Sequence, residues 1–426
     1  MRKLRKHRNH LIPAAAFLLC LIGAWLGWST GSLALMFSAS LGLCYVLIRL
    51  AVSGRVWRRR PAPRPADPPE SSCPRAVARA KVDPNDTDGL VEQMLAEGRF
   101  ALLLRRQVVG NLGRQQFRRS VAALREAMAL VPDGDVVLGR IDEALDDGKL
   151  EAEEILAARG RVTRVQRFFL DRYPVTNRQY SEFVTAGGYQ QVTLWDPSIL
   201  PAVLDFVDRT GMPGPRYWID GSFAAGEEQY PVVGVSWYEA SAYARWLGKR
   251  LPSDAEWVKA GSWPVPLSPT TREQRKYPWG EIMDRSRANL WGSGPLRIAP
   301  VTAFPESVSI GGVYQLIGNT WEWVSGDFRG ADHPQHELAL PAAMKSIRGG
   351  AFDTYFDNQA TCQFQSGENP LHRRHNIGFR CAVGTCDLVL SRPAQGALDV
   401  DAANEHGDEQ DERDAVTADC IEELHA

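Results

Sequence analysis

The sequence has no disulfide framework and no closely paired cysteines. Its seven cysteines are scattered over 426 residues, and two of them, Cys20 and Cys44, lie in an apolar stretch near the start. This distribution excludes a small secreted scaffold held together by disulfides. The globular part also lacks a dense run of Lys and Arg, so no nucleic-acid partner is expected. No alternation of strand and helix patterns and no internal repeat is visible, which argues against a parallel sheet.

Charge is balanced in total but not along the chain. The formal net charge is -2, from 49 Lys and Arg against 51 Asp and Glu. The first 64 residues are strongly basic outside their apolar stretch, and the last 40 are strongly acidic. The acidic end, 387–426, predicts a disordered tail.

An apolar stretch of about forty residues, 11–52, contains a single charge, Arg49. One membrane-spanning helix needs about 20 apolar residues, and a polar break at 29–31 divides the stretch into Leu11–Trp28 and Ser32–Leu50. We therefore predict two spans joined by a tight turn, whose flanking cations place both termini and the globular domain in the cytoplasm, at an inner (plasma) membrane. These cations are Arg2, Lys3, Arg5, Lys6 and Arg8 before the first span, and Arg49, Arg55, Arg58, Arg59 and Arg60 around the second. The alternatives are a single span with an exported domain and a cleaved signal peptide, which the length of the stretch disfavours.

The remaining chain divides by composition and periodicity. Apolar residues recur at three- and four-residue spacing over 88–128, which predicts a helical connector broken near Gly110 and Gly113. We expect it to pack on the main domain, and partner binding is the alternative. A charged, helical-looking insert follows at 142–164. The predicted parts are a basic N-terminus (1–10), a transmembrane hairpin (11–52), a linker (53–87), the helical connector (88–128), a globular domain (129–386) and the acidic tail (387–426).

Local signals in the globular part are those of short helices, turns and loops. Pro132-Asp133-Gly134 predicts a turn after a first strand. Three capping boxes, each with a hydroxyl at the N-cap and Glu or Gln three residues later, predict helix starts. They are Thr176-Asn177-Arg178-Gln179, Ser236-Trp237-Tyr238-Glu239 and Ser253-Asp254-Ala255-Glu256.

Short aromatic and glycine motifs follow one another in a fixed order through the second half of the chain. They are Asp171-Arg172-Tyr173-Pro174-Val175-Thr176-Asn177, Pro231-Val232-Val233-Gly234-Val235-Ser236-Trp237, Lys249-Arg250-Leu251-Pro252-Ser253-Asp254-Ala255-Glu256-Trp257, Tyr277-Pro278-Trp279-Gly280, Gly318-Asn319-Thr320-Trp321-Glu322-Trp323, Arg348-Gly349-Gly350 and Asn376-Ile377-Gly378-Phe379-Arg380-Cys381. The ordered set resembles the sulfatase-modifying-factor, or formylglycine-generating-enzyme, domain family over roughly 128–383. The resemblance implies an irregular α+β domain with a C-type-lectin-like core and little regular secondary structure, here preceded by the transmembrane hairpin.

The resemblance also locates the family's copper chemistry, in which two cysteines downstream of Arg-Gly-Gly bind copper and oxidise a substrate cysteine to formylglycine with oxygen. Counting from Arg348-Gly349-Gly350, the first of these positions falls on Thr354 and the second near Gln359. Because Cu(I) favours soft thiolate ligands, the two-cysteine copper mechanism is not expected here.

Two other cysteines match structural cysteines of the family. Cys362 matches one whose partner position falls near Gly261, and Cys381 matches one whose partner position falls on Ala244. Both family disulfides therefore lack a partner.

The resemblance further implies structural calcium, a hard cation that takes oxygen ligands. The residues matching the second family site are Gln315, Gly318, Thr320 and Glu322. Asn289 and Leu290 represent the first site, where the loop that brings an Asp is shortened to 291–295. The alternative is that Glu322 accepts hydrogen bonds without any metal.

Several loop residues are candidates for binding or catalysis. Two HxxH pairs, His333 with His336 and His372 with His375, offer imidazoles to a metal or are simply solvated. Related sulfoxide synthases carry a three-histidine iron site on an added helical bundle, but residues 85–128 contain no histidine. The catalytic candidates are an acid/base pair, Asp353 and Asp357, and the thiol of Cys362. The residues expected to line the family's ligand groove are Trp321, Arg348, Thr354, Tyr355, Arg373 and Arg374.

Three functions remain open at this point. The first is a non-copper, membrane-anchored family member that binds a peptide, protein or small ligand in the groove. The second is a metal- and oxygen-dependent oxidoreductase of the wider formylglycine-generating and sulfoxide-synthase family. The third is a membrane scaffold that acts through the tail and the helical connector.

Overall fold

The structure is a computed structural model of the full chain, and it describes residues 83, 86–139, 161–266, 272–328 and 343–391. The chain divides into two compact units, 1–72 and 73–426, and every described residue belongs to the second. The predicted transmembrane hairpin lies outside the described residues, as do the HxxH pair His333 and His336 and most of the acidic tail. In the ranges that the structure describes, no helix is both long enough and apolar enough to cross a membrane.

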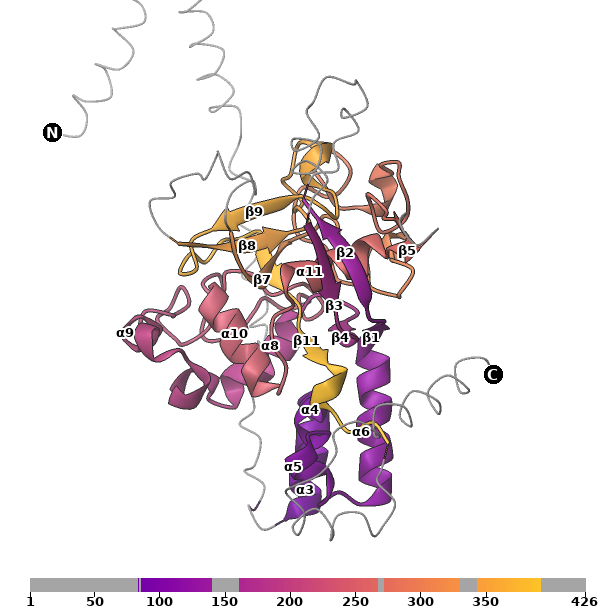
Figure 1. Cartoon of the computed structure of the whole chain (residues 1–426). Coiled ribbons are helices and arrows are strands. Elements are labelled where there is room, and N and C mark those ends of the chain that lie inside the picture. The colour runs from indigo at the N-terminus through magenta and orange to yellow at the C-terminus, as the bar shows by residue number, and fades with distance from the viewer. Residues whose placement is uncertain (1–82, 84–85, 140–160, 267–271, 329–342, 392–426) are drawn as a thin grey trace, which may run out of the picture. The chain divides into compact units, whose positions relative to one another are not determined.

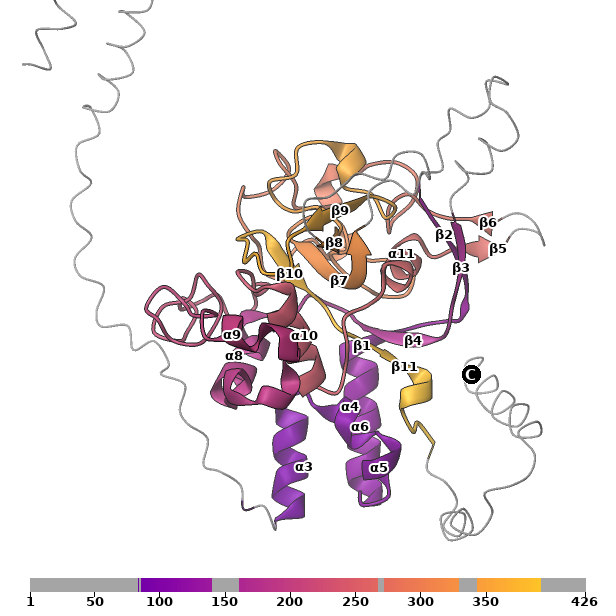
Figure 2. The same ribbon diagram turned by 60° about the vertical axis from the view of Figure 1, so that its left-hand side comes forward.

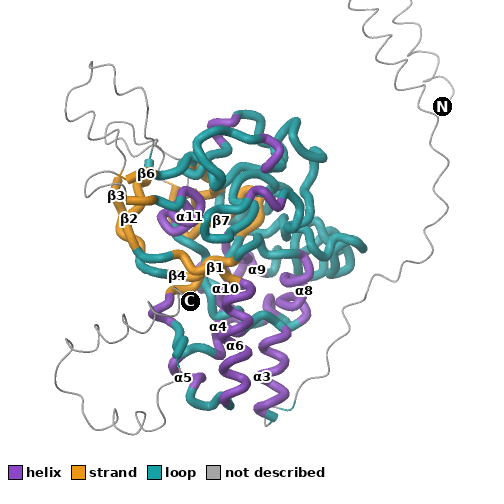
Figure 3. The backbone as a smooth tube through the Cα atoms, turned by 90° about the vertical axis from the view of Figure 1, so that its right-hand side faces the viewer, coloured by secondary structure: helices purple, strands orange, loops and turns teal. Residues whose placement is uncertain are grey.

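Short helices and short strands alternate with long irregular stretches (Figures 1 and 3). The α-helices are α3 (Thr87–Ala96), α4 (Phe100–Leu103), α5 (Arg106–Val109), α6 (Arg114–Ala127), α8 (Asn177–Thr185), α9 (Leu200–Val203), α10 (Trp237–Trp246) and α11 (Asp254–Ser262). The strands are β1 (Met128–Val131), β2 (Gly134–Leu138), β3 (Arg161–Val165), β4 (Phe168–Asp171), β5 (Val265–Pro266), β6 (Arg272–Glu273), β7 (Trp321–Phe328), β8 (Met344–Arg348), β9 (Gln365–Glu368), β10 (Ile377–Phe379) and β11 (Ala382–Gly384). The 3-10 helices are η2 (Gly188–Gln190), η3 (Val192–Leu194), η4 (Pro197–Ile199), η5 (Arg285–Arg287), η6 (Pro305–Ser307), η7 (Asp357–Gln359) and η8 (Thr385–Asp387). This mixed content agrees with the predicted α+β class.

The strands form small sheets. One has the order β1-β4-β11, a second has the order β10-β7-β8-β9, and β2 with β3 and β5 with β6 form two-stranded pairs. All pairings are antiparallel except that of β10 with β7, which aligns Ile377 with Trp321. The expectation of no parallel sheet therefore fails for this one pair. Its strands are joined by a connection that runs through β8 and β9 rather than by a single crossover helix, so no βαβ pattern announces it in the sequence.

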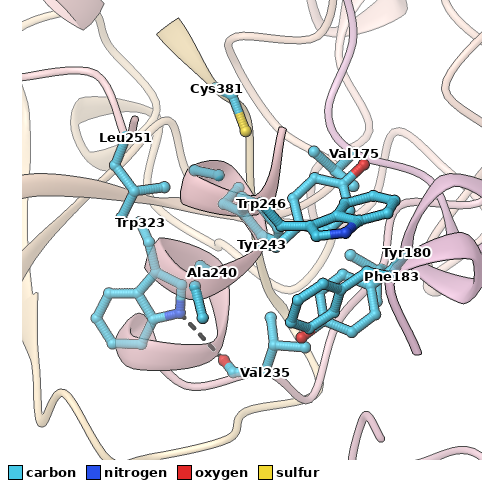
Figure 4. Close-up of a cluster of buried hydrophobic side chains, with 14 of the residues drawn as sticks. Val175, Tyr180, Phe183, Val235, Ala240, Tyr243, Trp246, Leu251, Trp323 and Cys381 are labelled. Atoms are coloured by element: carbon cyan, nitrogen blue, oxygen red, sulfur yellow. Dashed lines mark hydrogen bonds between the residues drawn. The ribbon is translucent and has the colours of Figure 1, made fainter. Parts of the chain in front are cut away.

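The three capping boxes are confirmed, and they begin α8, α10 and α11. In each, the N-cap hydroxyl accepts from the backbone N–H of the third helical residue, whose side chain accepts from the N-cap N–H. The first two helices contribute aromatic rings to one core cluster (Figure 4). Tyr180 stacks on Tyr243 at 5.2 Å and meets Phe183 edge-on at 5.4 Å. Such pairs contribute about 0.5–1.5 kcal/mol each beyond the burial of their area.

The helical connector is present and packs on the main domain, as predicted. Its apolar residues form one buried cluster with Phe169 of β4 and Val383 of β11, and α6 runs directly into β1 (Figure 2). The first half is more broken than predicted, because Gly98 takes a left-handed conformation (φ +74°) between α3 and α4. The second break is where it was expected, with Gly113 as the N-cap of α6.

Two predicted boundaries are wrong. The insert predicted as helical over 142–164 ends in strand β3, which pairs with β2 from Leu138 opposite Arg161. The tail does not leave the fold at Asp387, because Leu388 is buried in the connector cluster and the Val389 N–H donates to the Leu104 carbonyl at 2.8 Å. Apolar side chains at 388–390 thus tie the start of the acidic segment to the helices.

Candidate functional site

The loop after β8 contains Thr354 and Gln359, the two positions at which the resemblance places the family's copper ligands. Thr354 is buried, and its Oγ1 accepts from the Ala351 N–H at 2.8 Å. Its carbonyl accepts from the Trp291 N–H at 3.2 Å. Gln359 ends η7, with its N–H donating to the Phe356 carbonyl at 3.0 Å. At the two predicted copper positions, this chain therefore has a threonine that supports a turn and a residue that closes a 3-10 helix.

Three aromatic side chains around this loop face solvent. Tyr355 is 62% exposed, Phe356 is 59% exposed and Trp291 is 47% exposed. Tyr355 contacts both of the others, with ring centroids 5.1 Å from Phe356 and 6.5 Å from Trp291. We call Trp291, Tyr355 and Phe356 the aromatic surface. Two of its members, Trp291 and Phe356, were missed from the sequence, where aromatic residues in glycine-rich turns look the same whether they face the core or solvent.

An ion pair braces the aromatic surface. Arg285 contacts Asp357 at 2.5 Å and donates to the Trp291 carbonyl at 2.7 Å. Asp357 therefore fixes two loops to each other. Asp353 has different partners, since it accepts from Asn376 Nδ2 at 3.0 and 3.1 Å and lies 3.6 Å from His375 Nε2. The two aspartates do not form the predicted acid/base pair, because each is held by separate groups.

His372 and His375, the two histidines that the structure describes, contact different carboxylates. His372 Nδ1 lies 2.7 Å from Glu368 Oε1, and Arg374 Nε donates to the other oxygen of Glu368 at 2.7 Å. Burial acts to raise the pKa of Glu368, but hydrogen bonds from Arg374, from the Asn369 N–H and from His372 outweigh it and lower that pKa. No group of three or more His, Cys, Asp or Glu side chains suited to a metal occurs among the residues that the structure describes.

Two of the predicted groove arginines are buried structural residues. Arg348 Nε donates to Asp254 Oδ1 at 2.7 Å, and its NH1 donates to the Gln363 carbonyl at 3.0 Å. Arg373 Nε lies 2.9 Å from Glu239 Oε2. Each guanidinium is engaged by a carboxylate inside the fold, which disfavours the prediction that both hold a ligand directly.

The other predicted groove residues differ in accessibility. Arg374 remains half exposed beside Glu368, and Trp321 is partly buried against Phe364, with ring centroids 6.0 Å apart. Tyr355 is the groove candidate that is most open to solvent, whereas Thr354 is buried.

The surroundings of Cys362 disfavour the predicted role as a nucleophile. Its side chain is fully buried, and burial raises the pKa of its thiol, so the reactive thiolate is not formed near neutral pH. The thiol packs directly on α11, where a Cβ added to Gly261 would lie 2.9 Å from Cys362 Sγ. The family's partner position near Gly261 thus lies against Cys362 in space.

The predicted second calcium site contains an arginine that satisfies its carboxylate. Arg380 is fully buried and donates to both oxygens of Glu322 at 2.7–3.0 Å, and Trp257 Nε1 donates to Glu322 Oε2 at 2.8 Å. The Gln315 amide oxygen accepts from Asn319 Nδ2 at 2.8 Å. A guanidinium in contact with the carboxylate opposes a second cation, so these residues do not fit calcium in this arrangement.

The predicted first calcium site offers one isolated acceptor. Asn289 Oδ1 is buried and accepts no hydrogen bond from a described residue, but it faces the backbone of Gly294, where an added Cβ would lie at 1.8 Å. The Leu290 carbonyl already accepts from Ser293. Calcium takes six to eight oxygen ligands, and this arrangement does not supply such a set. Calcium stays a prediction that the geometry disfavours.

We expect calcium removal to leave the stability of the domain unchanged. The physical reason is that the Arg380 guanidinium, rather than a metal ion, faces the Glu322 carboxylate. The measurement is the melting temperature of the full chain in EGTA and in excess CaCl2, with MgCl2 as the matched control. A fall in melting temperature in EGTA that calcium alone reverses would contradict this expectation.

Comparison with known proteins agrees with the motif order. Residues 114–385 match the model of the sulfatase-modifying factor enzyme 1-like domain. The chain is 32% identical over 250 residues to a hercynine oxygenase of Mycolicibacterium thermoresistibile, covering 54% of each chain. It is 29% identical over 285 residues to an inactive C-alpha-formylglycine-generating enzyme 2 of Bos taurus, covering 60% of this chain and 88% of the relative. It is 29% identical over 308 residues to a formylglycine-generating enzyme of Thermomonospora curvata, covering 62% of this chain and 96% of the relative.

These relatives include an oxygenase, a formylglycine-generating enzyme and a protein named as inactive, so membership alone selects no activity. The chain spans about half the length of the hercynine oxygenase it matches. The family model covers more than half of this chain, and the motifs that carry the resemblance all lie within it or at its edge. The protein belongs to the sulfatase-modifying-factor family.

Proposed function

We propose that this chain is a non-copper family member that binds a peptide, protein or small ligand on the aromatic surface, and that residues 11–52 hold it at the inner face of a plasma membrane. The observation that carries the binding proposal is the exposure of Tyr355 and Phe356 (62% and 59%) on the loop between the two family copper positions. Clustered exposed aromatics are uncommon on soluble monomers and are typical of binding surfaces.

The geometry favours recognition over redox chemistry at this place. Thr354 replaces one soft ligand with a buried hydroxyl that is committed to a turn. The loop is also preorganised, because Arg285 joins Asp357 to the backbone of Trp291. A preorganised aromatic loop loses little conformational entropy when a ligand binds.

The proposal predicts that removing the two exposed rings abolishes most binding. A phage-displayed library of random peptides is selected on the full chain, and the enriched peptides are titrated against wild type and Tyr355→Ala/Phe356→Ala. We expect binding to weaken by at least about tenfold, because central aromatic residues dominate most interfaces. Leu204→Ala/Ile310→Ala removes two exposed apolar side chains elsewhere and serves as the matched control. Equal binding by wild type and the ring variant would contradict the proposal, and failure to enrich any peptide would exclude a peptide as the ligand.

A second candidate, an oxygen-dependent oxidoreductase, is favoured by the 32% identity to a hercynine oxygenase. In this chain a metal would need ligands beyond the described ranges, such as His333 and His336, since His372 and His375 already contact Glu368 and Asp353. Stoichiometric iron or copper in protein purified without chelator, lost in His333→Ala/His336→Ala, would favour this candidate over ligand binding alone.

A further inference from the structure

A pocket of about 490 Å³ lies away from the copper positions, between the loop after α9 and the segment that connects β9 to β10. Its lining contains three arginines, Arg209, Arg216 and Arg373, together with Tyr217. Neither the copper positions nor the aromatic surface contributes to it. The proposed function above does not use this pocket.

Arg373 builds the inner wall of the pocket rather than offering a free charge. Its NH1 donates to the Val207 carbonyl at 2.8 Å and its NH2 donates to the Gly214 carbonyl, so it holds both ends of the loop. Its charge is balanced from behind by Glu239, a fully buried carboxylate on α10. The position of the loop is therefore set by an ion pair inside the domain.

Asp208 is also satisfied within the loop. Its Oδ1 accepts from the Thr210 N–H and hydroxyl at 2.7 Å and from the Met212 N–H at 3.0 Å, and its Oδ2 accepts from the Gly221 N–H at 2.7 Å. Burial acts to raise the pKa of Asp208, but these hydrogen bonds outweigh it and lower that pKa. The negative charge of Asp208 is thus spread over four donors instead of being directed at the pocket.

The other two arginines are available at the mouth. Arg209 and Arg216 are exposed, and neither forms an ion pair with a residue in the described part of the chain. Their backbones are fixed, since the Arg209 N–H donates to Trp218 and the Arg216 N–H donates to Gly234. Against these two exposed cations the lining has one exposed carboxylate, Asp205. The mouth therefore carries a net positive charge of one.

Tyr217 supplies an aromatic ring beside Arg209 in the lining of the pocket. The Arg209 guanidinium lies 5.6 Å from the centre of its ring, and its hydroxyl donates to the Arg373 carbonyl at 3.3 Å. The ring also packs on Gly234, where an added Cβ would lie 2.6 Å from Tyr217 Cδ2 and where φ is +74°. The motif glycine Gly234 is therefore required for the placement of this ring.

We propose that this pocket binds a small anionic molecule, with its carboxylate or phosphate between Arg209 and Arg216 and an aromatic or apolar body on Tyr217. Guanidinium groups recognise both oxyanions through paired, charge-assisted hydrogen bonds. The hydrogen bonds within the loop hold the backbones of the two arginines in place without the ligand, which lowers the entropy cost of binding.

The test is calorimetric titration of the full chain with phenyl phosphate, benzoate and inorganic phosphate, with benzyl alcohol as the neutral probe. We expect saturable binding of phenyl phosphate or benzoate, weaker binding of inorganic phosphate and none of benzyl alcohol. The tighter of the first two identifies the oxyanion as phosphate or carboxylate. Arg209→Gln/Arg216→Gln is expected to weaken binding by about tenfold or more, and Tyr217→Leu is expected to reduce the preference for the ring-bearing probes.

A matched control variant distinguishes binding in this pocket from non-specific attraction of anions to the positive charges of the protein. Arg114→Gln/Arg118→Gln removes two exposed arginines from α6 and leaves the pocket unchanged. Three outcomes would overturn the proposal. The control could weaken binding as much as Arg209→Gln/Arg216→Gln does, or Arg209→Gln/Arg216→Gln could bind at wild-type strength. The wild type could also bind none of the anions at millimolar concentration. Tyr355→Ala/Phe356→Ala is expected to titrate like wild type, so the failure of this proposal and that of the aromatic surface are distinguishable.

Discussion

Replacing Gly261 with cysteine is expected to create a disulfide with Cys362 and to stabilise the domain strongly. A Cβ added at Gly261 would lie 3.7 Å from the Cβ of Cys362 and 2.9 Å from its Sγ, within the separations of real disulfides, whose Cβ atoms lie about 3.5–4.5 Å apart. The bond would close a loop of about 100 residues, for which the chain-entropy model gives about 4.7 kcal/mol and measured disulfides typically give about 2–4 kcal/mol. The measurement is denaturant unfolding of the oxidised protein, together with thiol titration.

The control for this prediction is the reduced form of the same variant. Without the bond, the new side chain only crowds Cys362 Sγ, so the reduced protein should be less stable than wild type. Gly261→Ser tests the same crowding without sulfur chemistry. Oxidation that removes no thiols from the titration, where the disulfide should remove two, or an oxidised variant no more stable than the reduced one, would contradict the packing of Cys362 against α11.

The Arg380→Met variant is expected to lose about 3–5 kcal/mol of unfolding free energy, because it leaves a buried charge without its partner. Glu322 is 1% exposed and Arg380 is fully buried. The arginine also donates to the Asp171 carbonyl at 3.0 Å and to the Tyr314 carbonyl at 2.8 Å, so three segments lose a common donor. Since domains are stable by about 5–15 kcal/mol, this loss is a large fraction of the total. Urea unfolding followed by tryptophan fluorescence measures it.

Two companions separate the charge from the lost hydrogen bonds. Glu322→Leu added to Arg380→Met removes the stranded carboxylate, and partial recovery is expected because apolar replacement of a buried ion pair is often neutral. Recovery should stay incomplete, since Trp257 Nε1 then loses its acceptor. Adding CaCl2 to Arg380→Met asks whether a cation takes over the role of the arginine. If Arg380→Met alone were as stable as wild type, this result would contradict the structural role assigned to the pair of Arg380 and Glu322.

Much of the local structure was predictable because its causes lie within a few residues. Each capping box contains both of its partners within four residues, so Thr176, Ser236 and Ser253 mark helix starts in any context that permits a helix. The connector helices follow from apolar spacing in the same way. The end of the insert was misread because charged residues hide a strand, β3, whose formation depends on pairing with β2.

The candidate site was predicted less well because its residues are defined by distant partners. Arg348 and Arg373 lie in segments whose sequence is typical of polar loops. In the fold, Arg348 is buried against Asp254, which is 94 positions away, and Arg373 is buried against Glu239, which is 134 positions away. Tyr355 was named from the sequence, whereas Trp291 joins it only through the contacts between two loops.

The amino-acid sequence by itself determined the family, the helix starts and the absence of thiolates at the copper positions, because residue identity and short spacing decide these. Only the tertiary structure decided that Arg380 pairs with Glu322, that Cys362 lies against Gly261, and that Arg209 and Arg216 share a pocket with Tyr217. The physical reason is that burial, charge pairing and pocket shape depend on which distant segments pack together, and that packing is a property of the whole fold.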